Sequence, residues 1–469
     1  MRRLTLAWLG AWLLTACQTA PTPDDARDLQ AAASARTGGP VPAPAATAAA
    51  IGEAATALLR QPLDDDAAVK IALLENRRVR AIYERLGIAR TDLVQAGLLR
   101  NPVLDADARF LFGGGAELEL GLAQPFLDVF WRPLRERAAA HDFAAAQALL
   151  TDELVHLVFA VRRVLVDLRA AQQLATVRRD ALRAAEAAHQ LAYALHAAGN
   201  LTDQALANER LGETRARLDL AAAELAVGEA REPVQRLLGL WGAWSDWQVA
   251  GELAPQPLAG LDLAHVETRA IRASLALTTH RARLEALAQR LGVTSWRQWF
   301  PDGGLGASAI RESDGDWGLG PKLTLELPLL DDGSTRRTRE EHALRSGLLE
   351  QTQLAVEIRS AARALRERAT ALAEQARFLR EVHLPAREAL VHATLQHYNA
   401  MQIGAFDALA QRRQQLADQR EYVTTLRDAH RARLDLQELL AGSLPASAWL
   451  APGSAEAPDD PSTANGAHR

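Results

Sequence analysis

Residues 103–112 read Val-Leu-Asp-Ala-Asp-Ala-Arg-Phe-Leu-Phe, and residues 116–122 read Ala-Glu-Leu-Glu-Leu-Gly-Leu. Side chains along a strand point alternately to its two faces, so both segments predict strands with one charged and one apolar face. Three glycines at 113–115 join the segments, which is typical of a hairpin. The charged face contains Asp105, Asp107, Arg109, Glu117 and Glu119.

This pattern returns about 200 residues later in the chain. A second hairpin is predicted within 304–329, with Lys322 and Glu326 on its polar face. Residues 124–128, Gln-Pro-Phe-Leu-Asp, resemble residues 327–331, Leu-Pro-Leu-Leu-Asp, at an offset of 203. A period this long predicts a duplicated domain rather than a solenoid array.

Long helical segments follow each predicted strand pair. Apolar residues recur at spacings of three and four over 133–198, and every seven residues over 335–402, as in coiled-coil seams. Each segment is followed, past a glycine, by a second one with apolar residues seven apart. Each copy is therefore predicted to form an antiparallel helical hairpin, over 133–238 and over 335–441.

Two short interruptions mark the predicted hairpin tips. Gly199-Asn200 and Gly404 break otherwise continuous helical patterns. Glycine commonly ends a helix and aspartate commonly begins the next, so Asp203 and Asp407 are predicted N-caps. Pro385 predicts a kink in the second long helix.

The N-terminus predicts export. Residues 1–16 have a positively charged start and a short apolar run, as in a secretory signal, whereas a membrane-spanning helix needs ~20 apolar residues. Residues 14–17, Leu-Thr-Ala-Cys, resemble the lipobox of bacterial lipoproteins. This resemblance implies that Cys17 is acylated, for example by palmitate, and that Gln18 beside it directs the chain to the outer membrane. A plain signal peptide with an incidental cysteine is the alternative.

Composition narrows the function classes. The chain has 469 residues, a formal net charge of -5 and one cysteine, which argues against nucleic-acid binding and excludes a disulfide framework. We expect no cofactor and no metal site, because His383, His392 and His397 do not share one helical face and are predicted surface residues. No nucleophile with a base and an orienting partner is recognisable, so the chain is not predicted to be an enzyme.

Residues 18–50 are rich in Ala, Thr, Pro and Gly and show no apolar periodicity, so they predict a tether. Together with the patterns above, this predicts six segments. The segments are a signal peptide (1–16), a lipidated tether (17–60), the first repeat (61–240, with strands in 103–124), a linker (241–261), the second repeat (262–442) and a C-terminal tail (443–469).

Alternating polarity alone is also compatible with a soluble, half-buried sheet. The length of the segments favours the membrane, because a tilted membrane strand needs ~9–11 residues. Four strands cannot close a barrel, and open edges are not tolerated in lipid, so several chains would share one barrel. Three chains would supply twelve strands.

The order and duplication of these elements over residues 60–442 resemble the outer membrane factor (TolC) family, the exit ducts of tripartite efflux pumps and type I secretion systems. The shared motifs are Asn101-Pro102, Phe300-Pro301, Pro125-Phe126, Pro328-Leu329 and the helix-turn segment 404–409. The resemblance implies a mainly α-helical fold with a small β part. It also implies a homotrimer with a 12-stranded barrel in outer membrane lipid, a helical tunnel in the periplasm and a collar around residues 239–262.

The resemblance also implies functional residues. Tyr398 and Asp407 match a gate at the periplasmic tip of the tunnel, although a second acid of that gate corresponds to Ala410 here. Asp407 is equally well explained as a helix cap, and Arg412 and Arg413 either pair with it or form a solvated face. A periplasmic adaptor protein would dock on the tips at Gly199, Asn200, Leu201, Gly404, Ala405 and Phe406. The barrel lumen would be lined by Asp105, Asp107, Glu117, Glu119, Lys322 and Glu326.

The hypothesis from sequence is therefore a passive trimeric conduit, gated at its coiled-coil tip by an adaptor and an inner-membrane pump. Drugs, metal ions and secreted proteins are all compatible cargoes, and the sequence does not select a pump class. One alternative is a lipid-anchored periplasmic coiled-coil scaffold, which would bury the apolar strand faces against its own helices. A lipoprotein hydrolase is a further alternative.

Overall fold

The structure is a computed structural model that describes residues 23–42, 48–110, 112, 116–255, 262–299, 303–312, 314–326 and 330–448. Cys17, the glycines 113–115, Phe300-Pro301 and Pro328-Leu329 lie outside the described residues, as does the chain beyond 448. The strands are β1 (Val103–Phe110), β2 (Ala116–Pro125), β3 (Gly303–Arg311) and β4 (Trp317–Leu325). The predicted strand pairs are confirmed.

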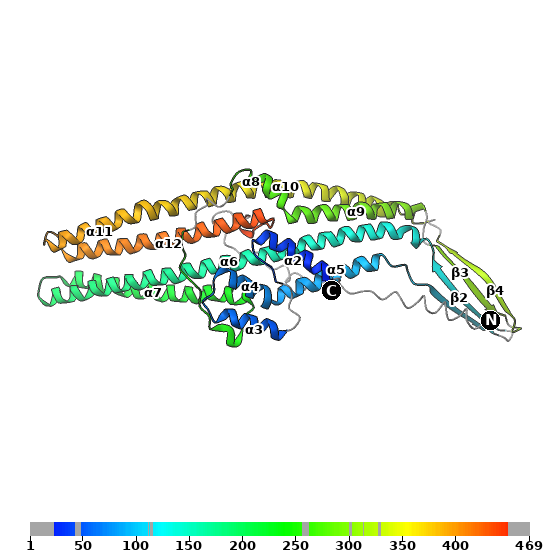
Figure 1. Cartoon of the computed structure of the whole chain (residues 1–469), viewed down its shortest axis with the longest axis horizontal. Coiled ribbons are helices and arrows are strands. Elements are labelled where there is room, and N and C mark those ends of the chain that lie inside the picture. Colours follow the sequence, from blue (N-terminus) through cyan, green and yellow to red (C-terminus); the bar gives the residue numbers. More distant parts are fainter. Residues whose placement is uncertain are drawn as a thin grey trace. The chain divides into compact units, whose positions relative to one another are not determined.

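Helices make up most of the described chain (Figure 1). The shorter ones are α2 (Pro23–Thr37), α3 (Ala48–Leu59), α4 (Asp65–Glu75), α5 (Arg77–Ala96), α8 (Val266–Ala273) and α9 (Leu275–Trp299), with the 3-10 turns η1 (Gly242–Ser245) and η4 (Ala446–Ala448). The long ones are α6 (Asp128–Ala197), α7 (Asp203–Leu238), α10 (Ser334–Phe378), α11 (Leu384–Asn399) and α12 (Ala405–Ala441). The predicted mainly helical fold is confirmed.

The described residues form two compact units that do not coincide with the two sequence repeats. The first unit draws on Met1–Ala46, Arg77–Leu154 and Leu275–Val356, and the second on Thr47–Asn76, Val155–Ser274 and Glu357–Arg469. The first unit therefore contains the whole sheet, and the second contains both helical tips. Each unit combines segments of both repeats.

The four strands form one antiparallel sheet in the order β1-β2-β3-β4. Within each repeat the hairpin partners pair directly, and β2 pairs with β3 across the repeats. β1 and β4 each have one unpaired edge, because nothing else is hydrogen-bonded to them in the described sheet. The sheet is thus open at both sides.

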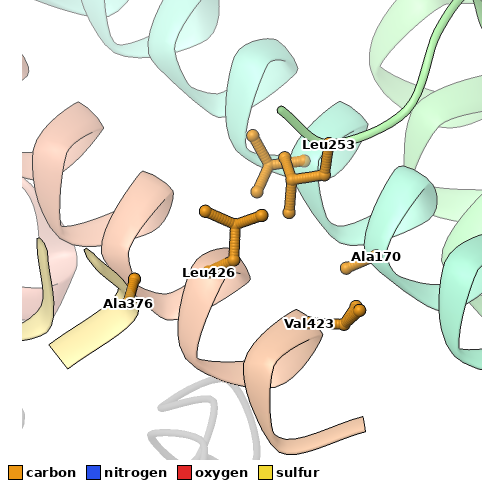
Figure 2. Close-up of a cluster of buried hydrophobic side chains, with 6 residues drawn as sticks. Ala170, Leu253, Ala376, Val423 and Leu426 are labelled. Atoms are coloured by element: carbon orange, nitrogen blue, oxygen red, sulfur yellow. The ribbon is translucent and has the colours of Figure 1, made fainter. Parts of the chain in front are cut away.

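A hydrophobic cluster joins three of the long helices in the second unit (Figure 2). Ala170 of α6, Ala376 of α10 and Leu426 of α12 are all buried in it. Leu253, from the segment after α7, fills the space between them. Helices α6, α10 and α12 therefore share one buried apolar cluster within the second unit.

Two expectations about helix starts are wrong. The tether predicted over residues 17–60 contains α2 and α3, and Leu29 and Ala33 of α2 are buried, with Asp25 paired to Arg90 of α5 at 3.5 Å. Small apolar residues bury little area, so the sequence pattern underestimates such a helix. The first long helix begins at Asp128 rather than at residue 133, which leaves Pro133 inside it.

A π-helical turn (η3, Leu379–His383) separates α10 from α11, immediately before Pro385. The N–H of Leu384 donates to the carbonyl of Leu379, a spacing of five residues rather than four. Proline has no N–H to donate and disturbs the preceding turn, so the irregularity predicted from Pro385 takes this form.

Candidate functional site: the sheet faces and the helical tips

The strand register assigns every sheet residue to one of two faces. Paired residues point to the same side, and Asp107 pairs with Glu119 while Ala106 pairs with Leu120. The same rule applied to the other pairings places all large apolar residues except Val103 and Ile310 on one face. That apolar face contains Leu104, Phe110, Leu118, Leu120, Leu122, Leu305, Trp317, Leu319, Leu323 and Leu325.

The apolar face is exposed in the single chain. Phe110 is 82% exposed and Leu319 is 83% exposed, and Leu104, Leu122 and Leu323 are more than half exposed. A soluble scaffold would cover these side chains with its own helices. An exposed apolar face of this extent is characteristic of a membrane or protein contact surface.

The opposite face is polar, and many of its positions are glycines. By register it carries Asp105, Asp107, Glu117, Glu119 and Lys322, together with Arg109 and Thr324. Its remaining positions include Gly121, Gly304, Gly306, Gly318 and Gly320. Glu326 lies one residue beyond β4. The residues predicted to line a lumen therefore share one face, apart from Glu326 at its end.

A buried aspartate fastens the sheet to the first long helix. Asp128 is fully buried and accepts hydrogen bonds from Arg135 Nη1 at 2.6 Å and from the Arg100 backbone N–H at 3.2 Å. Burial opposes ionisation, but the hydrogen bonds from Arg135 and Arg100 outweigh it and lower the pKa of Asp128. Gln124 donates to the Arg100 carbonyl at 2.7 Å, which ties in the end of β2.

Sequence reasoning found Asp128 only as a repeated motif position and missed both arginines. The equivalent Asp331 accepts from Arg336 Nη2 at 2.8 Å and from the N–H of Gly333 at 2.9 Å. Its side chain is 64% exposed. The same motif residue thus has a structural role in the first repeat and a surface role in the second.

The first tip closes as a Schellman motif. Gly199 has a φ of 77°, the N–H of Asn200 donates to the carbonyl of Leu195 at 2.8 Å, and Gly199 donates to His196 at 2.8 Å. Thr202, not Asp203, is the N-cap of α7, and its hydroxyl accepts from the N–H of Ala205 at 3.3 Å. The N-cap predicted at Asp203 is therefore wrong.

The second tip has the same backbone with different residues. Met401 has a φ of 59° and occupies the position that Gly199 has in the first tip, with Gln402 donating to the carbonyl of His397 at 3.0 Å. Gly404 is the N-cap of α12. Asp407 is the third residue of α12 rather than its cap, and its carboxylate accepts from the Gly404 N–H at 3.1 Å.

The tip residues predicted from the resemblance lie where the hairpins turn. Gly199, Asn200, Gly404 and Asp407 are exposed, and Leu201, Ala405 and Phe406 are half-buried. Tyr398, the second-last residue of α11, is also exposed. Arg412 donates to Gln415 and Arg413 to Glu209 of α7 at 3.2 Å, so neither arginine pairs with Asp407.

Sequence reasoning missed a second buried carboxylate. Asp418 of α12 is 4% exposed and accepts from Arg387 Nε at 2.6 Å and from His383 at 3.0 Å. Burial acts to raise the pKa of Asp418, and hydrogen bonds from Arg387, Gln414 and His383 reverse this and lower it. His383, predicted as a surface histidine, therefore connects the π-helical turn to α12.

The linker after α7 contributes one buried aromatic. Trp247 is buried beneath the guanidinium of Arg231, whose carbon lies 4.3 Å from the centre of the ring. Trp241 remains 70% exposed. Leu63 and Val249 form an isolated parallel bridge, so this linker is tied to the segment before α4. Among the described residues, no group of three or more histidine, cysteine or carboxylate side chains could hold a metal ion.

Comparisons with known proteins give structural matches only. No family model and no curated protein matches the chain. A membrane protein from Pseudomonas aeruginosa aligns with a TM-score of 0.68 and 19% identity, over 82% of this chain and 93% of that one. The outer membrane protein VceC from Vibrio cholerae aligns with a TM-score of 0.64 and 16% identity, over 85% and 97%. CusC aligns with a TM-score of 0.63 and 16% identity, over 81% and 92%. The chain therefore has the fold of these outer-membrane channel proteins, as the resemblance to the outer membrane factor family implied.

Proposed function

We propose that the chain is one subunit of a homotrimeric outer-membrane channel, the exit duct of a tripartite efflux or type I secretion system. The observation that carries this proposal is the open four-stranded sheet, with one exposed apolar face and one polar face. Unpaired strand edges are not stable in hydrocarbon, so β1 and β4 need partner strands. Further copies of the chain supply them, and three copies give an even-numbered barrel of twelve strands.

A leucine stripe on the first hairpin supports assembly of several copies. Leu211, Leu218 and Leu225 of α7 are seven residues apart, and each is more than 60% exposed. The corresponding seam of α12 is covered within the chain, because Leu416 is 3% and Val423 is 8% exposed. An uncovered heptad stripe is typical of a helix that packs against another chain.

The structural matches support the same reading. CusC is described in terms of transmembrane channel formation, and MtrE from Neisseria gonorrhoeae as an outer membrane channel in its open state. By analogy, the sheet lies in the outer membrane and the helical hairpins extend into the periplasm, with Cys17 as a lipid anchor. The channel is a passive conduit and performs no covalent chemistry.

We place the gate at the second tip. The capping hydrogen bond of Asp407 uses Oδ2, which leaves Oδ1 without a partner among the described residues. Three such carboxylates around a threefold axis would repel one another and bind cations, with Tyr398 beside them. An adaptor that docks on the exposed tips, and a pump behind it, would favour the separated arrangement.

Assembly and conductance of the full chain test the proposal. We expect a detergent-extracted trimer and discrete conductance steps in planar bilayers. Leu218→Glu should dissociate the trimer while the helical content remains, whereas Glu224→Gln, a change on the same helix outside the stripe, should leave it intact. A soluble monomer without conductance would contradict the channel and support the scaffold.

The gate needs a separate pair of variants. Asp407→Ala removes both the charge and the cap, and Asp407→Asn removes the charge but retains an oxygen that accepts from Gly404. If Asp407 is a gate residue, both variants raise the single-channel conductance or abolish block by divalent cations. If only Asp407→Ala has an effect, Asp407 acts only through its hydrogen bond to the Gly404 N–H and the gate assignment is wrong.

A further inference from the structure

An ion pair joins the two edge strands on the polar face of the sheet. Lys322 Nζ of β4 donates to Asp105 Oδ2 of β1 at 2.8 Å, although β2 and β3 lie between these strands. In a flat sheet, three strand spacings would separate β1 from β4 by about 14 Å. The two side chains and the hydrogen bond together span about 12 Å at full extension. The polar face is therefore concave.

Two positions near this ion pair are glycines with no room for a side chain. A Cβ atom at Gly121 would lie 2.8 Å from Lys322 Nζ and 3.3 Å from Asp105 Oδ2, so the pair rests directly on β2. Gly306, the register partner of Lys322, has no room for a side chain either, because a Cβ there would lie 1.9 Å from the carbonyl oxygen of Leu122.

The remaining acidic side chains on this face have fewer basic residues to pair with. Asp107 and Glu119 are directly opposite each other in the register, a like-charge pair that destabilises a sheet. Both carboxylates act on the Lys322 ammonium, but the hydrogen bond from that ammonium goes to Asp105. Arg109, the other basic residue on the face, is opposite Glu117. The acidic charge without a cation in register is therefore that of Asp107 and Glu119.

We infer that Lys322 is a selectivity-determining residue of the conduit: it neutralises Asp105 and so limits the preference for small cations over anions that Asp107 and Glu119 give the barrel. This inference rests on the proposed channel function, in which the polar face lines the lumen. Fixed charges on a pore wall raise the local concentration of the opposite ion. With three subunits, the effect of each residue is present three times around the axis.

Reversal potentials in planar bilayers across a potassium chloride gradient test the inference. The wild-type channel should prefer potassium over chloride. Lys322→Met exposes the Asp105 charge and should raise the permeability ratio about twofold or more. The double variant Lys322→Met/Asp105→Asn removes both partners and should keep the wild-type ratio, with a higher conductance because the ion pair no longer occupies the lumen.

The possible results distinguish a failure of the inference about Lys322 from a failure of the proposed channel function. A conducting Lys322→Met channel with an unchanged ratio overturns the inference and leaves the channel function intact, and so does a double variant that shifts as far as the single one. If Lys322→Met does not assemble, Asp107→Asn/Glu119→Gln replaces it. That variant should lower the ratio about twofold or more, and an unchanged ratio overturns the inference. Failure of the wild-type chain to conduct contradicts the proposed function.

Discussion

The first repeat buries the aspartate that follows its second strand, whereas the second repeat exposes it. Asp128 is enclosed with Arg100 and Arg135, and Asp331 is 64% exposed beside Arg336. The chain positions are equivalent and the backbone plan is the same, but the environments differ. A duplicated motif therefore predicts where an element begins, and not what its side chains do.

In the helical hairpins the difference in burial is reversed: here the first repeat is the exposed one and the second is the buried one. The return helix of the first repeat exposes its leucine stripe, and that of the second repeat buries the corresponding seam around Leu416. The second hairpin also carries the π-helical turn, which has no counterpart in the uninterrupted α6. The first hairpin thus has an exposed apolar stripe, whereas the corresponding seam of the second is buried.

The largest difference in unfolding free energy between the two repeats is expected when the motif aspartates, Asp128 and Asp331, are replaced. Asp128→Ala should lower the free energy of unfolding by about 2–4 kcal/mol, because it removes the charged hydrogen bonds from Arg135 and Arg100. Asp331→Ala, at the equivalent exposed position, should cost less than about 1 kcal/mol. Denaturant unfolding of the detergent-solubilised chain measures both. Equal losses would show that the burial of Asp128 has no energetic consequence.

Acid should affect the second hairpin through Asp418. Its folded pKa lies below the unfolded value of about 3.9, so the ionised carboxylate stabilises the fold above that pH, and this contribution is lost as the pH falls toward the folded pKa. Asp418→Asn should be less stable at neutral pH, by about 2–4 kcal/mol, and less sensitive to acid.

Asp167 is a matched control with the opposite sign. Burial is the main cause that raises its pKa, partly offset by Arg431, so protonation stabilises the fold as the pH falls through the raised folded value. Asp167→Asn removes this gain, so the variant should lose more stability than the wild type as the pH falls. Thermal unfolding across pH 3–7 distinguishes the two variants, and parallel pH profiles for both would refute the assignment of the two shifts.

The smallest expected effect is at the tips. Met401 holds a left-handed conformation that costs a side chain roughly 1–2 kcal/mol, so Met401→Gly should stabilise the chain by about 1 kcal/mol. Gly199→Ala should destabilise the first tip by a similar amount, because its φ is also positive. Thermal unfolding of the two variants should shift in opposite directions, and shifts of the same sign would disprove the shared tip geometry.

Periodic features could be predicted from the sequence. Strand alternation places Glu117 and Glu119 on one face whatever the tertiary structure, and heptad leucines such as Leu218 specify long helices. Features that depend on distant partners could not be predicted. The contact of Lys322 with Asp105 needs the β2–β3 pairing, and Asp418 sits inside a helix with no local signal.

The N-cap predictions at Asp203 and Asp407 are wrong for a chemical reason. Aspartate is favourable both at the N-cap and in the first helical turn, so Asp203 and Asp407 carry the same local signal in either place. The structure assigns the cap to Thr202 in the first tip and to Gly404 in the second. The similarity of Gly199 and Gly404 in sequence is likewise not a structural equivalence, because Gly404 begins a helix and Met401 has the left-handed conformation.

Spin labels on β2 and β4 test whether one face of the sheet contacts lipid and the other contacts water. Single labels at Leu319→Cys on the apolar face and Glu119→Cys on the polar face would be placed in a Cys17→Ser chain reconstituted in vesicles. We expect the label at 319 to collide preferentially with oxygen dissolved in the bilayer, and the label at 119 with a water-soluble nickel complex. Equal accessibility of both labels to the nickel complex would contradict it.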